Sequence, residues 1–159
     1  DRHREGYRHW DMTVFGWKYN MDNIQGAMLL PQMDRLEENW RKCRELTAYY
    51  ESRLWDIPNL SRPQTLPNVE HAQHLFTVWI GAGKRDHVIS ELQKAGVGVM
   101  VNYRAIHLLS YFSETYGFKP GDFPVAERIG DSTLSLPFYP NIPVEDVDRV
   151  IEVLREILH

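Results

Sequence analysis

The sequence contains little that would support a disulfide, a zinc site or a membrane span. Cys43 is the only cysteine among 159 residues, so the chain can form neither an internal disulfide nor a cysteine-based zinc site. This sparing use of cysteine fits a reducing cytoplasm, where we expect the protein to reside. No apolar run approaches the roughly 18–20 residues that a membrane-spanning helix needs. The opening residues, DRHREGYRHW, lack the apolar segment of a signal peptide.

Positive charge and the common nucleotide-binding motifs are also lacking. The formal net charge of −4 argues against nucleic acid as the main partner. Gly96 and Gly98 lie between a helical pattern and a strand pattern, the reverse of a dinucleotide-binding loop, so a helix cap explains them better. The sequence has no GxxxxGK[ST] loop and no GxSxG elbow. His71 and His74 have no third ligand at a matching spacing, so we expect no metal site.

The composition that remains is that of an ordinary soluble domain. Apolar residues make up 43% and charged residues 25%, and the length suits one domain or a piece of a larger one. Residues 1–21 show no helical or strand period and are rich in aromatic side chains, which predicts a loop that packs on another domain or chain. Because the first residue is not methionine, a processed, a trimmed and an incomplete N-terminus all stay open as explanations.

A long helical pattern covers residues 22–57. Asp22 and Gln25 have the spacing of a capping box at its start. Apolar residues then recur every three to five positions on one face: Ile24, Met28, Met33, Leu36, Trp40, Cys43, Leu46, Tyr50 and Leu54. Pro31 either kinks one long helix or separates a short helix from a longer one. The position of Cys43 on the apolar face predicts a buried, inert thiol.

Strand and helix patterns alternate through residues 58–159, after a proline-rich irregular connection. The predicted strands are His74–Ile80, Val97–Tyr103 and Ser132–Phe138. The predicted helices are Arg85–Ala95 with Gly96 as its cap, a short helix around Leu108–Tyr116, one or two turns within Val125–Gly130, and a last helix that begins at Pro143. The order predicts an α+β domain with a three-stranded sheet.

Two polar clusters are candidates for a binding site. Lys18 and Asn20 precede the first helix, where backbone N–H groups and a nearby cation could bind an anion, although a simple surface turn explains them as well. Asn102, Tyr103, Arg104 and His107 follow the middle predicted strand. Ligand-facing polar groups often lie on loops after strands, but hydrogen bonds within the loop are an equal alternative there.

At these clusters the sequence resembles the DegT/DnrJ/StrS family of pyridoxal-phosphate-dependent nucleotide-sugar aminotransferases. The matching stretches, in the order and spacing of the family, are Gly16–Tyr50, HLFTVWI at His74–Ile80, AGVGVMVNYRAIHLLSYF at Ala95–Phe112, and LSLPFYPNIPVEDVDRVIEVL at Leu134–Leu154. The GxxYxM segment at the start of a long helix, followed much later by SLPFYP, is the most specific part. Together these stretches cover most of the chain.

The resemblance implies the small C-terminal domain of a fold-type-I aminotransferase, with a long linking helix and a three-stranded, mainly antiparallel sheet with helices on one face. Residues 1–21 would be a loop remnant of the cofactor-domain junction, 22–57 the linking helix, kinked near Pro31, and 58–159 the small α+β domain. None of the five lysines lies in a segment like the one that carries the Schiff-base lysine in the family. The isolated chain is therefore expected to be inactive, since that amine performs the chemistry.

The family also implies roles for both clusters. In its dimers, the loop before the long helix reaches the cofactor phosphate of the partner subunit, which assigns this contact first to Asn20 and then to Lys18. Members usually have GxNxRM in this loop, whereas this chain has lysine at the usual asparagine and asparagine at the usual arginine. Tyr103, Arg104 and His107 match the HYxxxxH segment of the sugar-nucleotide site, where Asn102 replaces a histidine.

The implied function is amino transfer, with glutamate as the expected donor and a keto sugar nucleotide as acceptor. The Lys18 and Asn20 pair and the YRAIH run look closest to enzymes that aminate a UDP-linked 4-keto sugar. The product would serve lipopolysaccharide, other cell-surface polysaccharide or amino-sugar biosynthesis, in a homodimer without nucleic-acid or membrane partners. The alternative is a non-catalytic module of the same fold that dimerises or binds a sugar nucleotide.

Overall fold

A computed structural model describes residues 19–81 and 83–159 of the protein. The chain divides into two units, Asp1–Arg35 and Leu36–His159, and each is described by itself. Lys18 lies outside the described residues. Of the predicted loop at residues 1–21, only residues 19–21 are described. None of the described helices has the length and the apolar composition that crossing a membrane requires.

The first unit contains one described helix, α1 (Asn23–Met33). The predicted capping box is confirmed: the Asp22 carboxylate accepts from the Gln25 N–H at 2.7 Å, and the Gln25 side chain accepts from the Asp22 N–H at 3.2 Å. Pro31 lies inside α1, and the helix ends two residues later at Met33. A turn at residues 34–35 separates α1 from the next helix, so the short-plus-long alternative is the one observed.

The second unit is an α+β domain, which confirms the predicted fold class. Its elements in order are α2 (Leu36–Leu54), β1 (Leu60–Ser61), β2 (Phe76–Ile80), α3 (Arg85–Lys94), the 3-10 helix η1 (Ile106–Leu108), α4 (Ser110–Tyr116), α5 (Pro124–Ser132), β3 (Thr133–Leu136) and α6 (Val144–Leu158). The strands form one antiparallel sheet in the order β1-β2-β3, with Leu60 opposite Ile80 and Phe76 opposite Leu136.

The predicted strand Val97–Tyr103 is wrong. Only Met100 pairs with the sheet, through two hydrogen bonds with Ser135 of 3.2 and 2.7 Å, and the third strand is instead β1, within the stretch we expected to be irregular. The apolar alternation of residues 97–101 reflects burial rather than pairing, because Val97 is buried in the core. Alternation alone does not distinguish these two causes.

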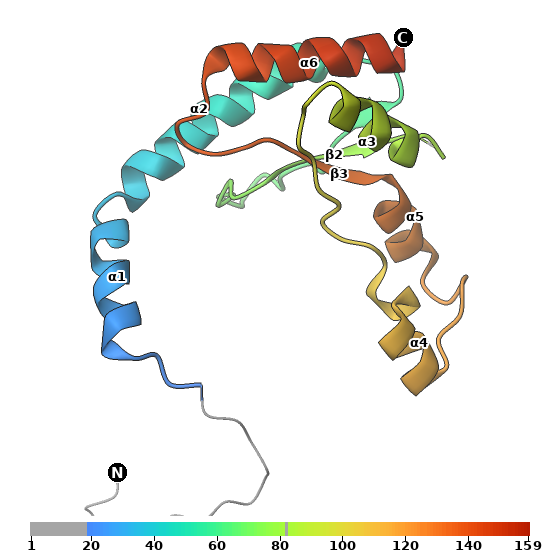
Figure 1. The fold of residues 1–159 in the computed structure, drawn as a ribbon, viewed down its shortest axis with the longest axis horizontal. Helices are drawn as coiled ribbons and strands as arrows, with labels where there is room; N and C mark the ends of the chain where they lie inside the picture. The colour runs from blue at the N-terminus through green and yellow to red at the C-terminus, as the bar shows by residue number, and fades with distance from the viewer. Residues whose placement is uncertain (1–18, 82) are drawn as a thin grey trace, which may run out of the picture. The chain divides into compact units, whose positions relative to one another are not determined.

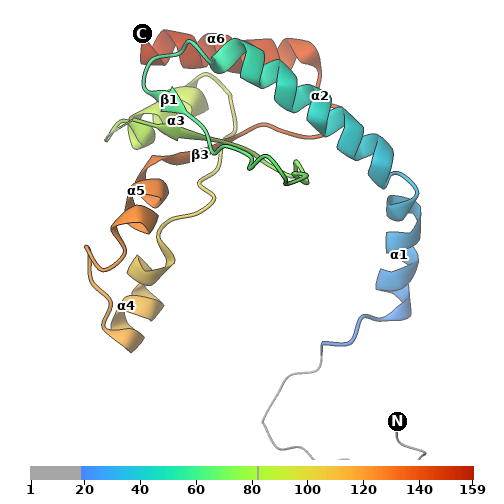
Figure 2. The same ribbon diagram turned by 180° about the vertical axis from the view of Figure 1, so that it is seen from behind.

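The core lies on one face of the sheet, beneath α2, α3 and α6 (Figures 1 and 2). Strand β2 alternates buried and half-buried residues, so Phe76, Val78 and Ile80 point into this core. The buried face of α6 consists of Val147, Val150, Ile151, Leu154 and Leu158. Each fully buried aliphatic side chain contributes roughly 1.5–3 kcal/mol, so this layer supplies most of the stability of the unit.

The predicted cap at Gly96 and the predicted burial of Cys43 are both observed. Gly96 has a φ of +80° after α3, its N–H donates to Gln93 O at 3.0 Å, and the Val97 N–H donates to Leu92 O at 2.8 Å. This is the Schellman pattern that glycine favours at a helix end. Cys43 is buried on α2, and burial raises the pKa of its thiol. An inert structural role follows for this residue.

Candidate functional site

The candidate site in the second unit is built on the segment that leaves the sheet after Met100. The bridge to Ser135 fixes its start, and the Thr133 hydroxyl donates to Asn102 O at 3.4 Å. The peptide bond between Asn102 and Tyr103 is cis. The segment then enters η1, whose turn is closed by the Leu108 N–H donating to Ala105 O at 3.0 Å. Both ends of the segment are therefore held by hydrogen bonds.

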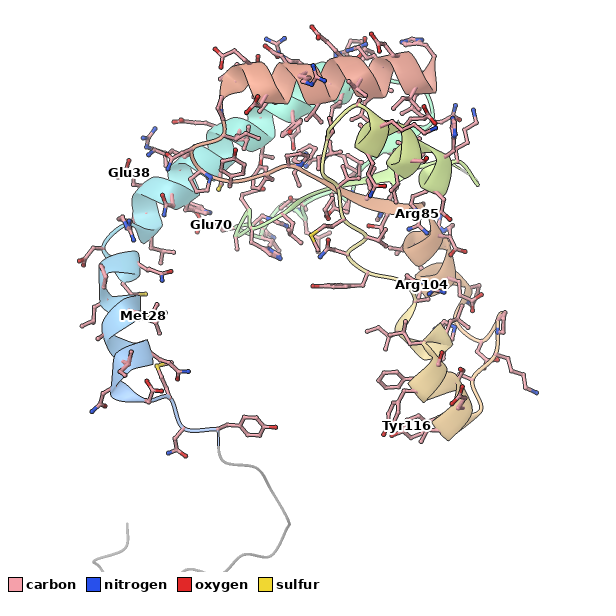
Figure 3. All side chains as sticks on the ribbon, viewed as in Figure 1. Met28, Glu38, Glu70, Arg85, Arg104 and Tyr116 are labelled. Carbon is pink, nitrogen blue, oxygen red and sulfur yellow. The ribbon has the colours of Figure 1, made fainter. Side chains whose placement is uncertain are left out.

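Tyr103 and Arg104, two residues of the predicted binding cluster, project from this segment. Both are exposed, Tyr103 to 71%. They border an open groove of about 500 Å³ whose walls combine aromatic and aliphatic side chains. Its main lining residues are Tyr103, Arg104, His107, Phe112, Phe118 and Phe123. Figure 3 labels Arg104 on this segment and Tyr116 at the end of α4. A groove with a guanidinium and stacking rings suits a ligand with an aromatic ring and negative charge.

His107 has a different environment from its two neighbours in the predicted site. It is only 7% exposed, and its Nε2 lies 3.0 Å from Glu127 Oε1. The ring packs edge-on against Phe123, with ring centres 4.8 Å apart, and more loosely against Phe118. Since an ionised carboxylate only accepts hydrogen bonds, Nε2 must carry the proton that it donates to Glu127. The nitrogen is thus engaged within the protein.

Asn102 presents a buried acceptor. Its side-chain Oδ1 is buried and receives no hydrogen bond from the described part of the chain. Leaving such an acceptor unpaired costs about 1–3 kcal/mol, so a donor is expected to be supplied when the site is complete. At this position the family resemblance expects a histidine, which can also donate or accept.

Glu127 is a residue of the site that no sequence pattern indicates. Its carboxylate accepts from the Gly121 N–H at 2.8 and 3.0 Å, from the Phe123 N–H at 3.2 Å and from His107. Burial raises the pKa of this carboxyl, but the bonds from Gly121, His107 and Phe123 outweigh it and leave the pKa below its usual value. Sequence spacing gave no signal, because Glu127 and His107 are 20 residues apart.

Asn20 lies in the first unit, in the extended residues before α1. Its side chain is exposed. The neighbouring Asp22 carboxylate already accepts the free N–H of Gln25, which places negative charge at the helix N-terminus. An anion bound by this unit would therefore depend on side chains such as Asn20 rather than on the helix end. Lys18, the second predicted phosphate contact, is outside the described residues.

The lysines in the described part of the chain do not line the groove. Lys42 pairs with Glu38 at 2.7 Å, and Lys94 pairs with Glu91 at 2.8 Å. Lys84 and Lys119 are exposed. Residues 19–81 and 83–159 also contain no group of three or more potential metal ligands. His71 instead accepts from the Gln73 N–H at 2.9 Å through Nδ1.

Comparison with known proteins gives the family. The model of the DegT/DnrJ/EryC1/StrS aminotransferase family matches residues 2–155, which is nearly the whole chain. The chain belongs to this family. The resemblance inferred from the sequence stretches is therefore confirmed, and the aminotransferase family accounts for the α+β fold of the second unit.

Two curated relatives and one solved structure illustrate the similarity. The spore coat polysaccharide biosynthesis protein SpsC of Bacillus subtilis is 32% identical over 158 residues, which cover 96% of this chain and 41% of SpsC. The UDP-4-amino-4-deoxy-L-arabinose–oxoglutarate aminotransferase of Shewanella sediminis is 29% identical, with 90% of this chain and 39% of that enzyme covered. The crystal structure of DesV from S. venezuelae, solved with a ketimine intermediate, superposes with a TM-score of 0.82 at 28% identity and covers 98% of this chain and 41% of DesV.

The chain thus spans about two fifths of the length of the curated relatives it matches. A family model that matches residues 2–155 establishes kinship and fold for this stretch. It does not by itself assign an activity to the stretch, because the function of an enzyme depends on residues at its site rather than on its fold.

Proposed function

We propose that this chain is the C-terminal part of a pyridoxal-phosphate-dependent aminotransferase that transfers an amino group to a keto sugar nucleotide. The family match over residues 2–155 carries the proposal. Glutamate is the proposed donor and a UDP-linked 4-keto sugar the proposed acceptor, in cell-surface polysaccharide or amino-sugar biosynthesis. The Shewanella relative, whose name gives a UDP-linked 4-amino sugar and oxoglutarate, supports this substrate class.

The groove supports a binding role for the second unit. In the proposed complex, Tyr103 and Arg104 contact the sugar nucleotide, Tyr103 through its ring and hydroxyl and Arg104 through its cationic fork. Asn102, the fourth residue of the predicted site, does not line the groove, and its Oδ1 is buried, so we assign it no contact with the substrate. His107, with its Nε2 engaged by Glu127, contributes the rim of the groove rather than a free nitrogen.

The described residues suit a contact to the cofactor phosphate but not the Schiff-base role. Asn20 is exposed and can donate from its amide, and we assign it the phosphate contact in a homodimer, with Lys18 as the second donor. Pyridoxal phosphate, when bound, supplies the electron sink that amino transfer requires. Because no described lysine lines the groove, the lysine amine has to come from another part of the protein, and this chain alone is proposed to be inactive.

The test is to express the complete reading frame that encodes this chain and to assay amino transfer from glutamate to a UDP-4-keto sugar. A reading frame without a lysine-bearing cofactor domain before Asp1, or a purified protein that does not transfer the amino group, would overturn the proposal. Asn20→Ala and Lys18→Ala should weaken pyridoxal phosphate binding, followed by absorbance, whereas the exposed α6 variant Glu152→Gln should not. Equal affinity in all variants would remove the phosphate assignment alone.

A further inference from the structure

Helix α5 runs along the segment that carries Tyr103 and Arg104 and meets it at three evenly spaced points. Glu127 bonds to His107, Gly130 packs on Ala105, and Thr133, the residue directly after the helix, bonds to Asn102 O. Glu127 and Gly130 are three residues apart and therefore lie on one side of the helix, and Thr133 follows the helix as the first residue of β3. Their partners occur in the reverse order, so helix and segment run antiparallel.

The middle contact allows no side chain. A Cβ added to Gly130 would lie 2.6 Å from the backbone N of Ala105 and 3.2 Å from the backbone C of Arg104. Glycine is required here because the backbone next to Arg104 approaches the helix backbone directly. A side chain at position 130 would therefore push the backbone of Arg104 and Ala105 away from the helix.

Glu127 joins α5 to the loop before it and to η1, at the end of the segment that carries His107. Its four hydrogen bonds reach the loop before α5 through Gly121 and Phe123, and η1 through His107. Its side chain is 17% exposed, so solvent competes little for these donors. Charge-assisted bonds of this kind are about twice as strong as neutral ones, which makes Glu127 a firm anchor for the His107 end of the segment.

Arg85 of α3 holds the C-terminal end of α5 through two hydrogen bonds. Arg85, labelled in Figure 3, lies at the start of α3. Its buried guanidinium donates to Gly130 O at 3.1 Å and to Thr133 O at 3.3 Å. Both acceptors lie at the C-terminal end of α5, where backbone carbonyls lack partners within the helix. Arg85 therefore fixes the position of α5 relative to α3 through contacts that do not involve the segment.

We infer that α5 positions the segment Asn102–His107, and that Glu127 and Gly130 are positioning residues for Tyr103 and Arg104. The inference rests on the proposed function in taking these two exposed side chains as ligand contacts. His107 changes role accordingly: it holds the segment to Glu127 instead of touching the sugar nucleotide.

The first arm of the test measures the segment itself by amide hydrogen exchange in the 159-residue chain. Glu127→Gln replaces an acceptor oxygen with an amino group that cannot satisfy all of the present donors. The Leu108 and Leu109 amides, which donate to Ala105 O and Ile106 O, should then exchange about tenfold faster, while Val88 in α3 stays unchanged. His107→Gln, which keeps a donor near the Nε2 position, should preserve more protection than His107→Ala. Unchanged exchange at Leu108 and Leu109 in Glu127→Gln overturns the inference.

The second arm measures affinity for UDP by calorimetry. Glu127→Gln and Gly130→Ala should weaken UDP binding at least about fivefold although neither residue would touch the ligand, whereas Val150→Ala, a buried α6 variant, should lower stability without changing affinity. Faster exchange with unchanged UDP affinity overturns the positioning role. These affinities are measured in the protein expressed from the complete reading frame; if its wild type does not bind UDP, the proposed nucleotide-sugar role fails, and the exchange arm alone decides whether α5 positions the segment.

Discussion

On one side of the sheet, α2, α3 and α6 contribute aliphatic and aromatic side chains that are almost completely removed from water. On the other side, α4 and α5 leave large apolar residues exposed, including Tyr111, Tyr116 and Val125. Helix α5 is held by contacts of Glu127, Gly130 and Arg85. The first region is stabilised by its buried apolar area, so the loss of a buried side chain there should lower stability. The second depends on a few directional contacts, so single changes there should affect position more than stability.

The largest expected effect lies in the first region. Leu154→Ala in α6 removes a fully buried side chain and should lower the free energy of unfolding by about 2–5 kcal/mol. Urea denaturation followed by circular dichroism measures this loss. Val144→Ala on the same helix, where the side chain is half exposed, should change stability by no more than about 0.5 kcal/mol. Similar losses in the two variants would contradict the description of the core.

Substitutions at two glycines, Gly130 and Gly26, test whether the close backbone contact of α5 contributes to stability. Gly130→Ala forces a Cβ against the Ala105 backbone and should cost about 1–3 kcal/mol in thermal unfolding. Gly26→Ala in α1, where a Cβ meets nothing within 4 Å, should cause no loss, since alanine favours helix more than glycine does. If Gly130→Ala is as stable as wild type, the close approach between α5 and the segment is not present in solution.

A smaller effect concerns acid stability. The pKa of Glu127 is lower in the folded protein than its usual 4.5, so the ionised carboxylate stabilises the fold at neutral pH. This contribution is complete above the unfolded pKa of about 4.5 and is lost as the pH falls through the folded value. Glu127→Gln should therefore be less stable than wild type at pH 7, and the difference should shrink as the pH is lowered to about 3. The exposed Glu152→Gln serves as control. A difference between Glu127→Gln and wild type that does not change with pH would contradict the assigned ionisation.

The smallest expected effect on stability comes from the exposed contact residues. Arg104→Ala and Tyr103→Ala should each change the free energy of unfolding by less than about 0.5 kcal/mol, because both side chains are exposed. UDP affinity, in contrast, should fall in both variants under the proposed function. A stability loss comparable to that of Gly130→Ala would show that these side chains support the fold.

Local signals in the sequence were sufficient for much of the helical structure. Asp22 with Gln25 predicted a helix start that is observed, Gly96 marked a helix end, and the apolar spacing of α6 predicted its buried face. The apolar face predicted for residues 24–54 is buried only in α2, at Cys43, Tyr50 and Leu54 among others, whereas Ile24 and Met28 of α1 are exposed. Periodicity predicts which side chains lie on the same face, but not whether anything in this chain covers that face.

The sequence by itself determined the family and the α+β class, because both depend on residue identity at short spacing. Only the tertiary structure decided that Val97–Tyr103 makes a single bridge and that His107 faces Glu127. Only it revealed the contact between Gly130 and Ala105. These features join residues 20 to 35 positions apart. Hydrogen bonds and close packing at that distance depend on how the chain turns between the partners, which no local pattern encodes.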